Sequence, residues 1–205
     1  MFRRLMAFTL VCVLWVGAAQ AGNYVLEIDG KTVELDLDAP ANVDLGGAKP
    51  VSVVLRQKSN QTWRSDGVLF EHPIAVKPSR REISDGVTQI IMATASGSAV
   101  LIQHYDNINP ERMIDLAVSQ MTDGEVRAGY KRTTEPATRK LADGTMLSGK
   151  QVHVERAKEY ANYEILATSS TGGYLIVTRV GDFAPKADRQ LVKRFWQTLR
   201  LNVTQ

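Results

Sequence analysis

Residues 87–105 read VTQIIMATASGSAVLIQHY, and this stretch does most to decide the fold. Two apolar, β-branched runs, residues 87–95 and 99–105, flank Ser96-Gly97-Ser98, a sequence typical of a tight turn. The pattern predicts a β-hairpin with one or both faces buried. We therefore expect two antiparallel strands in this segment.

Two helices are expected on the C-terminal side of this hairpin. Asn109 is a suitable N-cap, Pro110 fits the first helical position, and Asp123-Gly124 is expected to end the helix. The second helix is expected to begin at Pro185. Both have apolar residues at helical spacing: Met113, Ile114, Leu116, Ala117 and Met121 in the first, and Leu191, Val192, Phe195, Trp196 and Leu199 in the second.

Further strands are expected before and between the helices. A short strand at residues 68–70 ends at His72-Pro73. A meander follows Arg139, with strands at residues 151–155, 163–169 and 174–180 and turns at Asp143-Gly144, residues 159–162 and Thr171-Gly172-Gly173. The helices lie too far apart for repeated βαβ units, which disfavours a parallel doubly wound sheet. The expected fold class is α+β, an antiparallel sheet flanked by helices.

The start of the chain after residue 21 predicts a small separate β unit. Asp29-Gly30 lies between two alternating arms in residues 24–37, which is a strong hairpin signal. Short strands continue to Leu55. The predicted organisation is a signal peptide at residues 1–21, an N-terminal β unit at 22–62 and an α/β domain at 63–205.

Residues 1–21 have the three parts of a secretory signal peptide: a basic start at Arg3-Arg4, an apolar run and an A-x-A motif that ends at Ala21. We expect cleavage after Ala21 by the general secretory route and a periplasmic or secreted protein. The only cysteine, Cys12, lies in the apolar run, so the mature chain has no disulfide. No later apolar stretch is long enough to span a membrane.

The charge of the mature chain is nearly balanced, because removing Arg3 and Arg4 leaves 23 basic against 22 acidic residues. This balance argues against a nucleic-acid partner. Short basic clusters are interleaved with acids and are expected on solvated faces; convergence of several would favour contact with anionic lipid or polysaccharide. The clusters are Lys77 with Arg80-Arg81, Lys131-Arg132, Arg139-Lys140 and Lys193-Arg194.

Several short motifs follow one another in a characteristic order: Phe70-Glu71-His72-Pro73, the hairpin of residues 90–105, Pro110-Glu111, Leu147-Ser148-Gly149-Lys150, Gly172-Gly173-Tyr174 and Phe195-Trp196-Gln197-Thr198-Leu199. In this order the segment from Trp63 to Leu201 resembles the PsbP-like family of α/β sandwich proteins. The resemblance implies an α/β/α sandwich and a non-enzymatic module that binds a protein or a small ligand. It carries over no catalytic residues, and the N-terminal β unit has no counterpart in the family pattern.

Two motifs with catalytic associations lack their usual context. Residues 144–150 have the G-x-x-x-x-G-K spacing of a phosphate-binding loop, but Gln151 replaces the required Ser or Thr and a strand follows, so a hairpin turn is expected. No G-x-S-x-G nucleophile elbow is present. The sequence therefore assigns no catalytic residues and no cofactor.

The three histidines, His72, His104 and His153, are dispersed. His104 and Asp106 are two residues apart on one predicted strand face and would contribute to a metal site if a third ligand came from elsewhere. No metal ligands are assigned. Trp63 lies between polar neighbours without an obvious core pattern; it either packs between the two parts of the chain or is an exposed interaction residue.

The leading functional hypothesis is an exported, non-enzymatic envelope protein that acts as a protein-interaction module, through one sheet face or the N-terminal hairpin. The partner would be another envelope protein. One alternative is a periplasmic carrier of a small apolar or anionic ligand in a cleft between sheet and helix. The least favoured alternative is a metal-dependent or general-acid enzyme that uses His104 and Asp106.

Overall fold

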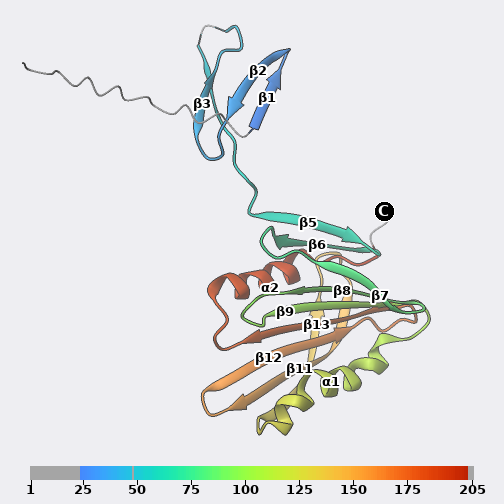
Figure 1. Cartoon of the computed structure of the whole chain (residues 1–205). Helices are drawn as coiled ribbons and strands as arrows, with labels where there is room; N and C mark the ends of the chain where they lie inside the picture. Colours follow the sequence, from blue (N-terminus) through green and yellow to red (C-terminus); the bar gives the residue numbers. More distant parts are fainter. Residues whose placement is uncertain (1–23, 48, 203–205) are drawn as a thin grey trace, which may run out of the picture. The chain divides into compact units, whose positions relative to one another are not determined.

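The structure, a computed structural model, describes residues 24–47 and 49–202. It divides the chain into two compact units, Met1–Gln57 and Lys58–Gln205 (Figure 1). The division lies five residues before the expected start of the main domain, so Trp63 and its strand belong wholly to the second unit. The predicted signal peptide, its cleavage site and Cys12 lie outside the described residues.

The first unit consists of two short antiparallel strand pairs. Strands β1 (Tyr24–Ile28) and β2 (Lys31–Leu35) pair across Asp29-Gly30, whose φ angles of 49° and 76° suit a two-residue hairpin turn, so the predicted hairpin is confirmed. Strands β3 (Pro40–Val43) and β4 (Val51–Val54) form the second pair.

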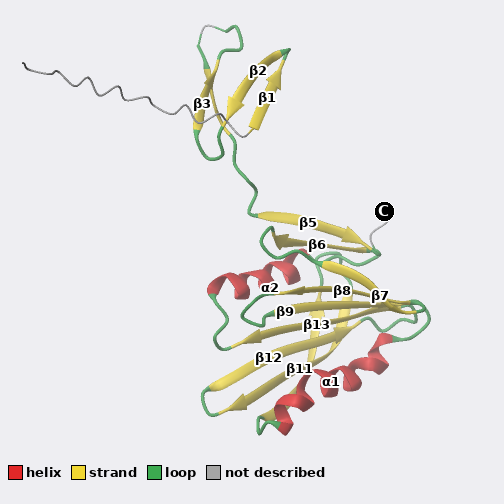
Figure 2. Ribbon diagram, in the orientation of Figure 1, coloured by secondary structure: helices red, strands yellow, loops and turns green. Residues whose placement is uncertain are grey.

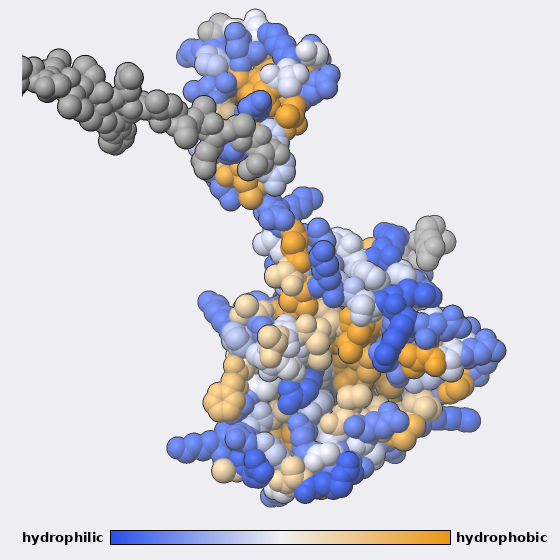
Figure 3. Space-filling model, in the orientation of Figure 1, coloured by the Kyte–Doolittle hydropathy of each residue, from blue (hydrophilic) through white to orange (hydrophobic). Residues whose placement is uncertain are grey.

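Few apolar side chains of the first unit are buried. Among its described residues, only Leu35 and Val43 belong to the buried apolar set, whereas Tyr24 and Val25 are 47% and 66% exposed. Hydrophobic surface is visible on this unit in Figure 3. Two buried side chains make a very small core for such a unit.

The second unit is built on a seven-stranded sheet with the strand order β10-β11-β12-β13-β9-β8-β7. Every neighbouring pair is antiparallel, which confirms the predicted antiparallel α+β class. The hairpin predicted from residues 87–105 is confirmed as β8–β9. The strands are β7 (Ser79–Ser84), β8 (Val87–Ala93), β9 (Ala99–Tyr105), β10 (Lys131–Lys140), β11 (Met146–Arg156), β12 (Glu159–Ala167) and β13 (Gly173–Gly181).

The sequence did not indicate the two edge strands, β7 and β10. Strand β10 reads KRTTEPATRK, and an edge strand tolerates such charges and Pro136 because one side of its backbone faces no partner strand. The predicted turn at residues 159–162 is wrong. The chain turns earlier, with Ala157 at φ 57°, and β12 begins at Glu159.

The two helices cover opposite faces of the sheet (Figure 2). Helix α1 (Ile114–Arg127), preceded by the short 3-10 turn η1 (Pro110–Met113), packs on β10, β11 and β12. The other face carries α2 (Lys186–Thr198) together with the hairpin of β5 (Asn60–Ser65) and β6 (Val68–Pro73). Neither helix of the described chain has the length and apolar character needed to cross a membrane.

The predicted N-cap of the first helix is confirmed, because the Asn109 side chain accepts a hydrogen bond of 3.0 Å from the Glu111 backbone N–H. The predicted end at Asp123-Gly124 is wrong: the helix continues to Arg127, and Gly129 follows with φ 91°. The extra turn places Glu125 where it accepts hydrogen bonds from the Tyr163 hydroxyl at 2.9 and 3.0 Å. Two residues of the predicted apolar stripe are largely exposed, Leu116 at 48% and Met121 at 36%.

Helix α2 agrees with its prediction, except that it ends at Thr198 and Leu199 is its C-cap. It follows Pro185, and the predicted apolar face, Leu191, Val192, Phe195, Trp196 and Leu199, is buried. In its first turn, the buried carboxylate of Asp188 accepts hydrogen bonds from the hydroxyls of Thr94 and Ser96 in the β8–β9 turn. Burial alone would raise the pKa of Asp188, but these hydroxyl donors outweigh it and hold the pKa below its usual value.

Candidate ligand-binding site

The face of the sheet that carries α2 changes from apolar to polar along strands β10 to β13. Residues directly opposite each other on antiparallel strands share a face, so the register defines rows across the sheet. The apolar row is Ala137, Gly149, Leu166 and Ile176; the first polar row is Glu135, Gln151, Glu164 and Thr178; the second polar row is Thr133, His153, Asn162 and Val180.

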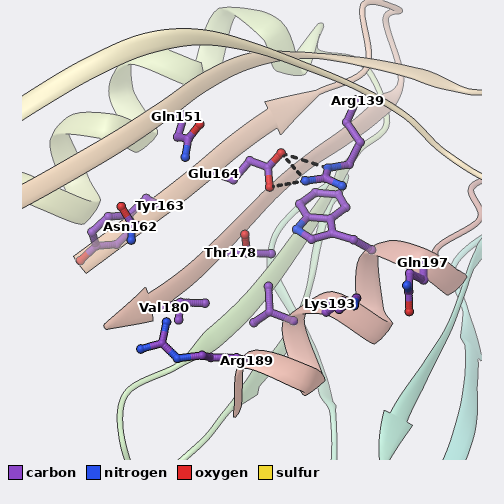
Figure 4. Close-up of a pocket in the computed structure, with 12 residues that line it drawn as sticks. Arg139, Gln151, Asn162, Tyr163, Glu164, Thr178, Val180, Arg189, Lys193 and Gln197 are labelled. Carbon is purple, nitrogen blue, oxygen red and sulfur yellow. Dashed lines mark hydrogen bonds and ion pairs between the residues drawn. The ribbon is translucent and has the colours of Figure 1, made fainter. Parts of the chain in front are cut away.

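Beside α2, the polar rows border an open cleft of about 590 Å³ (Figure 4). Its sheet wall includes Glu164 and Thr178, and its helix wall includes Lys193, Trp196 and Gln197. The edge strand β10 contributes Arg139. The cleft therefore lies between sheet and helix, in the position expected for the ligand-carrier alternative.

Arg139 and Glu164 form a two-bond ion pair in the cleft. Arg139 Nε donates to Glu164 Oε1 at 2.9 Å, and Arg139 Nη2 donates to Glu164 Oε2 at 2.8 Å (Figure 4). The guanidinium carbon lies 4.5 Å from the ring centroid of Trp196, a cation–π contact. The charge of Glu164 is thus balanced, and Arg139 is held along one edge by Glu164 and on one face by Trp196.

Two further cations of the cleft have no carboxylate partner among the described residues. Arg189 donates only to backbone carbonyls, at 3.2 Å to Ala184 and 2.9 Å to Asp182. Lys193 makes neither a hydrogen bond nor an ion pair within the described part of the chain. Because the charges of Arg139 and Glu164 balance each other, Arg189 and Lys193 leave the described cleft lining with a net charge of +2.

Trp196 adds a second unusual feature to the cleft wall. Its side chain is only 7% exposed, and its indole N–H has no acceptor within residues 24–47 and 49–202. A buried donor without an acceptor costs about 1–3 kcal/mol. The indole N–H of Trp63, outside the cleft, is also buried without a partner in the described residues, so the unpaired donor does not by itself identify a ligand site.

A smaller hollow of about 360 Å³ adjoins the cleft on the side away from α2. The two share Gln151 and Asn162, and the hollow adds Thr133, Glu135 and His153. His153 Nδ1 lies 2.8 Å from Asn162 Oδ1, so Nδ1 carries the proton and donates it. The Asn162 amide nitrogen remains as a donor on this surface.

The structure places the other candidate residues outside the cleft. Trp63 is half-buried on β5, where its ring centroid lies 6.5 Å from that of Phe70. His104 Nδ1 lies 3.4 Å from Asp106 Oδ1, and no group of three or more metal-ligating side chains occurs in the described ranges. His72 is buried, with Nδ1 donating to the backbone carbonyls of Pro73 and Val76.

The segment with phosphate-loop spacing forms the β10–β11 turn and the start of β11. Gly149 and Lys150 lie within the strand, and Lys150 pairs with Asp115. A Cβ atom on Gly149 would lie 2.1 Å from the Ile165 backbone oxygen, so this glycine permits a close approach of two strands. Gly149 therefore has a structural role here.

Two of the four basic clusters contribute to the cleft, one through Arg139 and the other through Lys193. The sequence marked both clusters but contained no sign that they meet. In β11 the polar residues Gln151 and His153 alternate with the buried residues Val152 and Val154. This alternation is the one local feature of the sequence that indicates a polar face on the sheet.

No protein-family model matches this chain, and no curated protein sequence matches it. The resemblance to PsbP-like proteins therefore stays a prediction.

Proposed function

We propose that this chain is an exported, non-enzymatic binding protein that holds an anionic ligand in the cleft between α2 and the sheet. The observation that carries the proposal is the positive charge of the cleft: Arg189 and Lys193 have no carboxylate partner, and Glu164 is cancelled by Arg139. Export is inferred from the signal-like residues 1–21.

The physical chemistry of the cleft favours an anion over a cation or a neutral apolar ligand. A recess between low-dielectric walls focuses the field of its charges and raises the local concentration of the opposite charge. A cationic ligand would find no free carboxylate in the described lining, because Glu164 already accepts two hydrogen bonds.

The same geometry supports a binding role more than catalysis. Glu164 is the one carboxylate in the described lining of the cleft, and both of its oxygens already accept hydrogen bonds from Arg139, so it is not free to act on a substrate. An activated nucleophile needs a base within hydrogen-bond reach, and the described lining offers no such pair.

A protein-interaction role is the second candidate function, and the first unit favours it. Its described residues bury Leu35 and Val43 but expose larger apolar side chains, such as Val25. Exposed apolar groups of this kind occur at protein contact surfaces. Cross-linking of the mature chain in intact envelope, followed by mass spectrometry, tests this role: a reproducible partner lost in Val25→Asp supports it, and no partner above background counts against it.

Trp196 provides a direct assay for ligand binding in the cleft. In the Trp63→Phe variant of residues 22–205, Trp196 is the remaining tryptophan, so its fluorescence reports on the cleft. We expect citrate and inorganic phosphate to change this fluorescence in a saturable way, and Lys193→Ala to weaken the response. Lys186→Ala, on the same helix but outside the cleft, is the matched control. No response and no heat of binding with citrate, phosphate or galacturonate would reject the proposed function.

A further inference from the structure

The cleft and the adjoining hollow form one continuous polar trough, because Gln151 and Asn162 line both. Their volumes are about 590 and 360 Å³. A compact anion such as phosphate would contact only the cationic end beside α2. The continuation along both polar rows indicates a ligand that extends away from the helix.

The two ends of the trough differ in chemistry. The end beside α2 carries Lys193 and Arg189, which can only donate hydrogen bonds and carry positive charge. The junction with the hollow carries the amides of Gln151 and Asn162, which both donate and accept, and the hollow itself adds Glu135, which accepts. Figure 4 shows Gln151 and Asn162 on the strands, across the opening from Lys193 and Gln197 on the helix.

This distribution matches a ligand with an anionic group and many hydroxyls. A hydroxyl both donates and accepts, so it pairs with side-chain amides and carboxylates alike. An acyl chain would need an apolar channel, whereas the described lining of the cleft offers only Tyr163 and three apolar side chains, Val180, Val192 and Trp196. The polar trough therefore disfavours a lipid tail.

We propose that the ligand is an acidic saccharide, bound with a carboxylate beside Lys193 and with further sugar rings along the first and second polar rows. The inference rests on the proposed function, because it names the ligand class of the same cleft. Gln151 is then a specificity residue, since it is exposed and lies where the cleft and the hollow meet.

Titration calorimetry with sugars of different charge and length tests this inference. The probes are glucuronic acid, an aldotriouronic acid whose single carboxylate is on its terminal glucuronic acid ring, and the neutral sugar maltotriose. We expect the acidic trimer to bind about tenfold more tightly than the acidic monomer, a difference of about 1.4 kcal/mol, and maltotriose to show no binding. Equal affinity for acidic monomer and trimer, or equal binding of maltotriose, would overturn the inference.

Two variants separate the contributions of charge and length. Lys193→Ala should weaken monomer and trimer alike, by roughly fivefold, whereas Gln151→Ala should weaken the trimer by a similar factor and leave the monomer within roughly twofold. Lys186→Ala should change neither. If Gln151→Ala has no selective effect on the trimer while citrate still binds, the saccharide inference fails and the proposed function stands. If citrate, phosphate and all acidic sugars fail to bind, both fail.

Discussion

The apolar row and the two polar rows occupy the same face of the same four strands, yet they have different surroundings. Leu166 and Ile176 of the apolar row are completely buried in the core that includes Phe195 of α2. Two residues further along the same strands, Glu164 and Thr178 line the cleft. Two residues along each strand thus separate the packed core from the lining of the cleft.

Helix α2 explains the difference between the rows. Its apolar side chains cover the apolar row, and its polar residues Lys193 and Gln197 border the cleft. The helix therefore contributes to stability on one side and to the proposed binding site on the other. The comparison implies that substitutions in the apolar row affect folding, and that substitutions in the polar rows mainly affect binding.

The largest expected effect comes from the apolar row. Leu166→Ala removes a completely buried side chain and leaves a cavity beside α2, so we expect a loss of about 2–5 kcal/mol in the free energy of unfolding. Urea unfolding followed by circular dichroism measures it. Leu116→Ala, at a position that is 48% exposed on α1, is the control and should change stability by about 0.5 kcal/mol or less. Similar costs for both variants would mean that the apolar row is not the core.

A smaller effect is expected where the first turn of α2 meets the β8–β9 turn. Asp188→Asn keeps the shape of the side chain but removes the charge that accepts hydrogen bonds from Thr94 and Ser96, and should cost about 1 kcal/mol at neutral pH. The pKa of Asp188 is lowered in the folded state, so its stabilisation is present above the ordinary value of 3.8 and is lost as pH falls through the folded pKa.

The difference between wild type and Asp188→Asn should therefore shrink in acid. Unfolding at neutral pH and at acidic pH measures this difference directly. Asp85→Asn, at an exposed position with no hydrogen-bond or ion-pair partner within the described residues, is the control and should show no such dependence. A difference that stays constant with pH would show that the charge of Asp188 does not hold α2 in place.

The sequence predicted the parts of the fold whose local pattern agrees with their burial. Helix α2 has its apolar side chains at helical spacing, and the β8–β9 hairpin has two apolar runs around Gly97. Strand β10 was not predicted, because an edge strand that is exposed over most of its length does not need alternating apolar and polar residues. The end of α1 was predicted wrongly because the last turn is held by a hydrogen bond between Glu125 and Tyr163 on β12, and the local sequence contains no sign of this contact.

The candidate site could be predicted only in part, for the same reason. The sequence showed the basic clusters, and a cleft between sheet and helix was one of the alternatives. It did not predict the Arg139–Glu164 ion pair, because these residues are 25 positions apart and meet only through the strand register. The alternation of Gln151 and His153 with buried residues marks a polar face. Which helix borders that face is decided by the tertiary packing of α2.

The smallest expected change in stability tests the comparison most sharply. Glu164→Gln breaks the ion pair with Arg139. The side chain of Glu164 is 21% exposed and that of Arg139 is 36% exposed. Because partly exposed ion pairs contribute little, the free energy of unfolding should change by about 1 kcal/mol or less. Glu71→Gln breaks a similar pair with Arg194 outside the cleft and should cost no more. Only Glu164→Gln should alter the affinity for citrate and galacturonate, because it frees the Arg139 guanidinium from its partner in the cleft. A loss of about 3 kcal/mol or more would instead place Arg139 and Glu164 in the class of buried pairs, and the first polar row would then belong to the core.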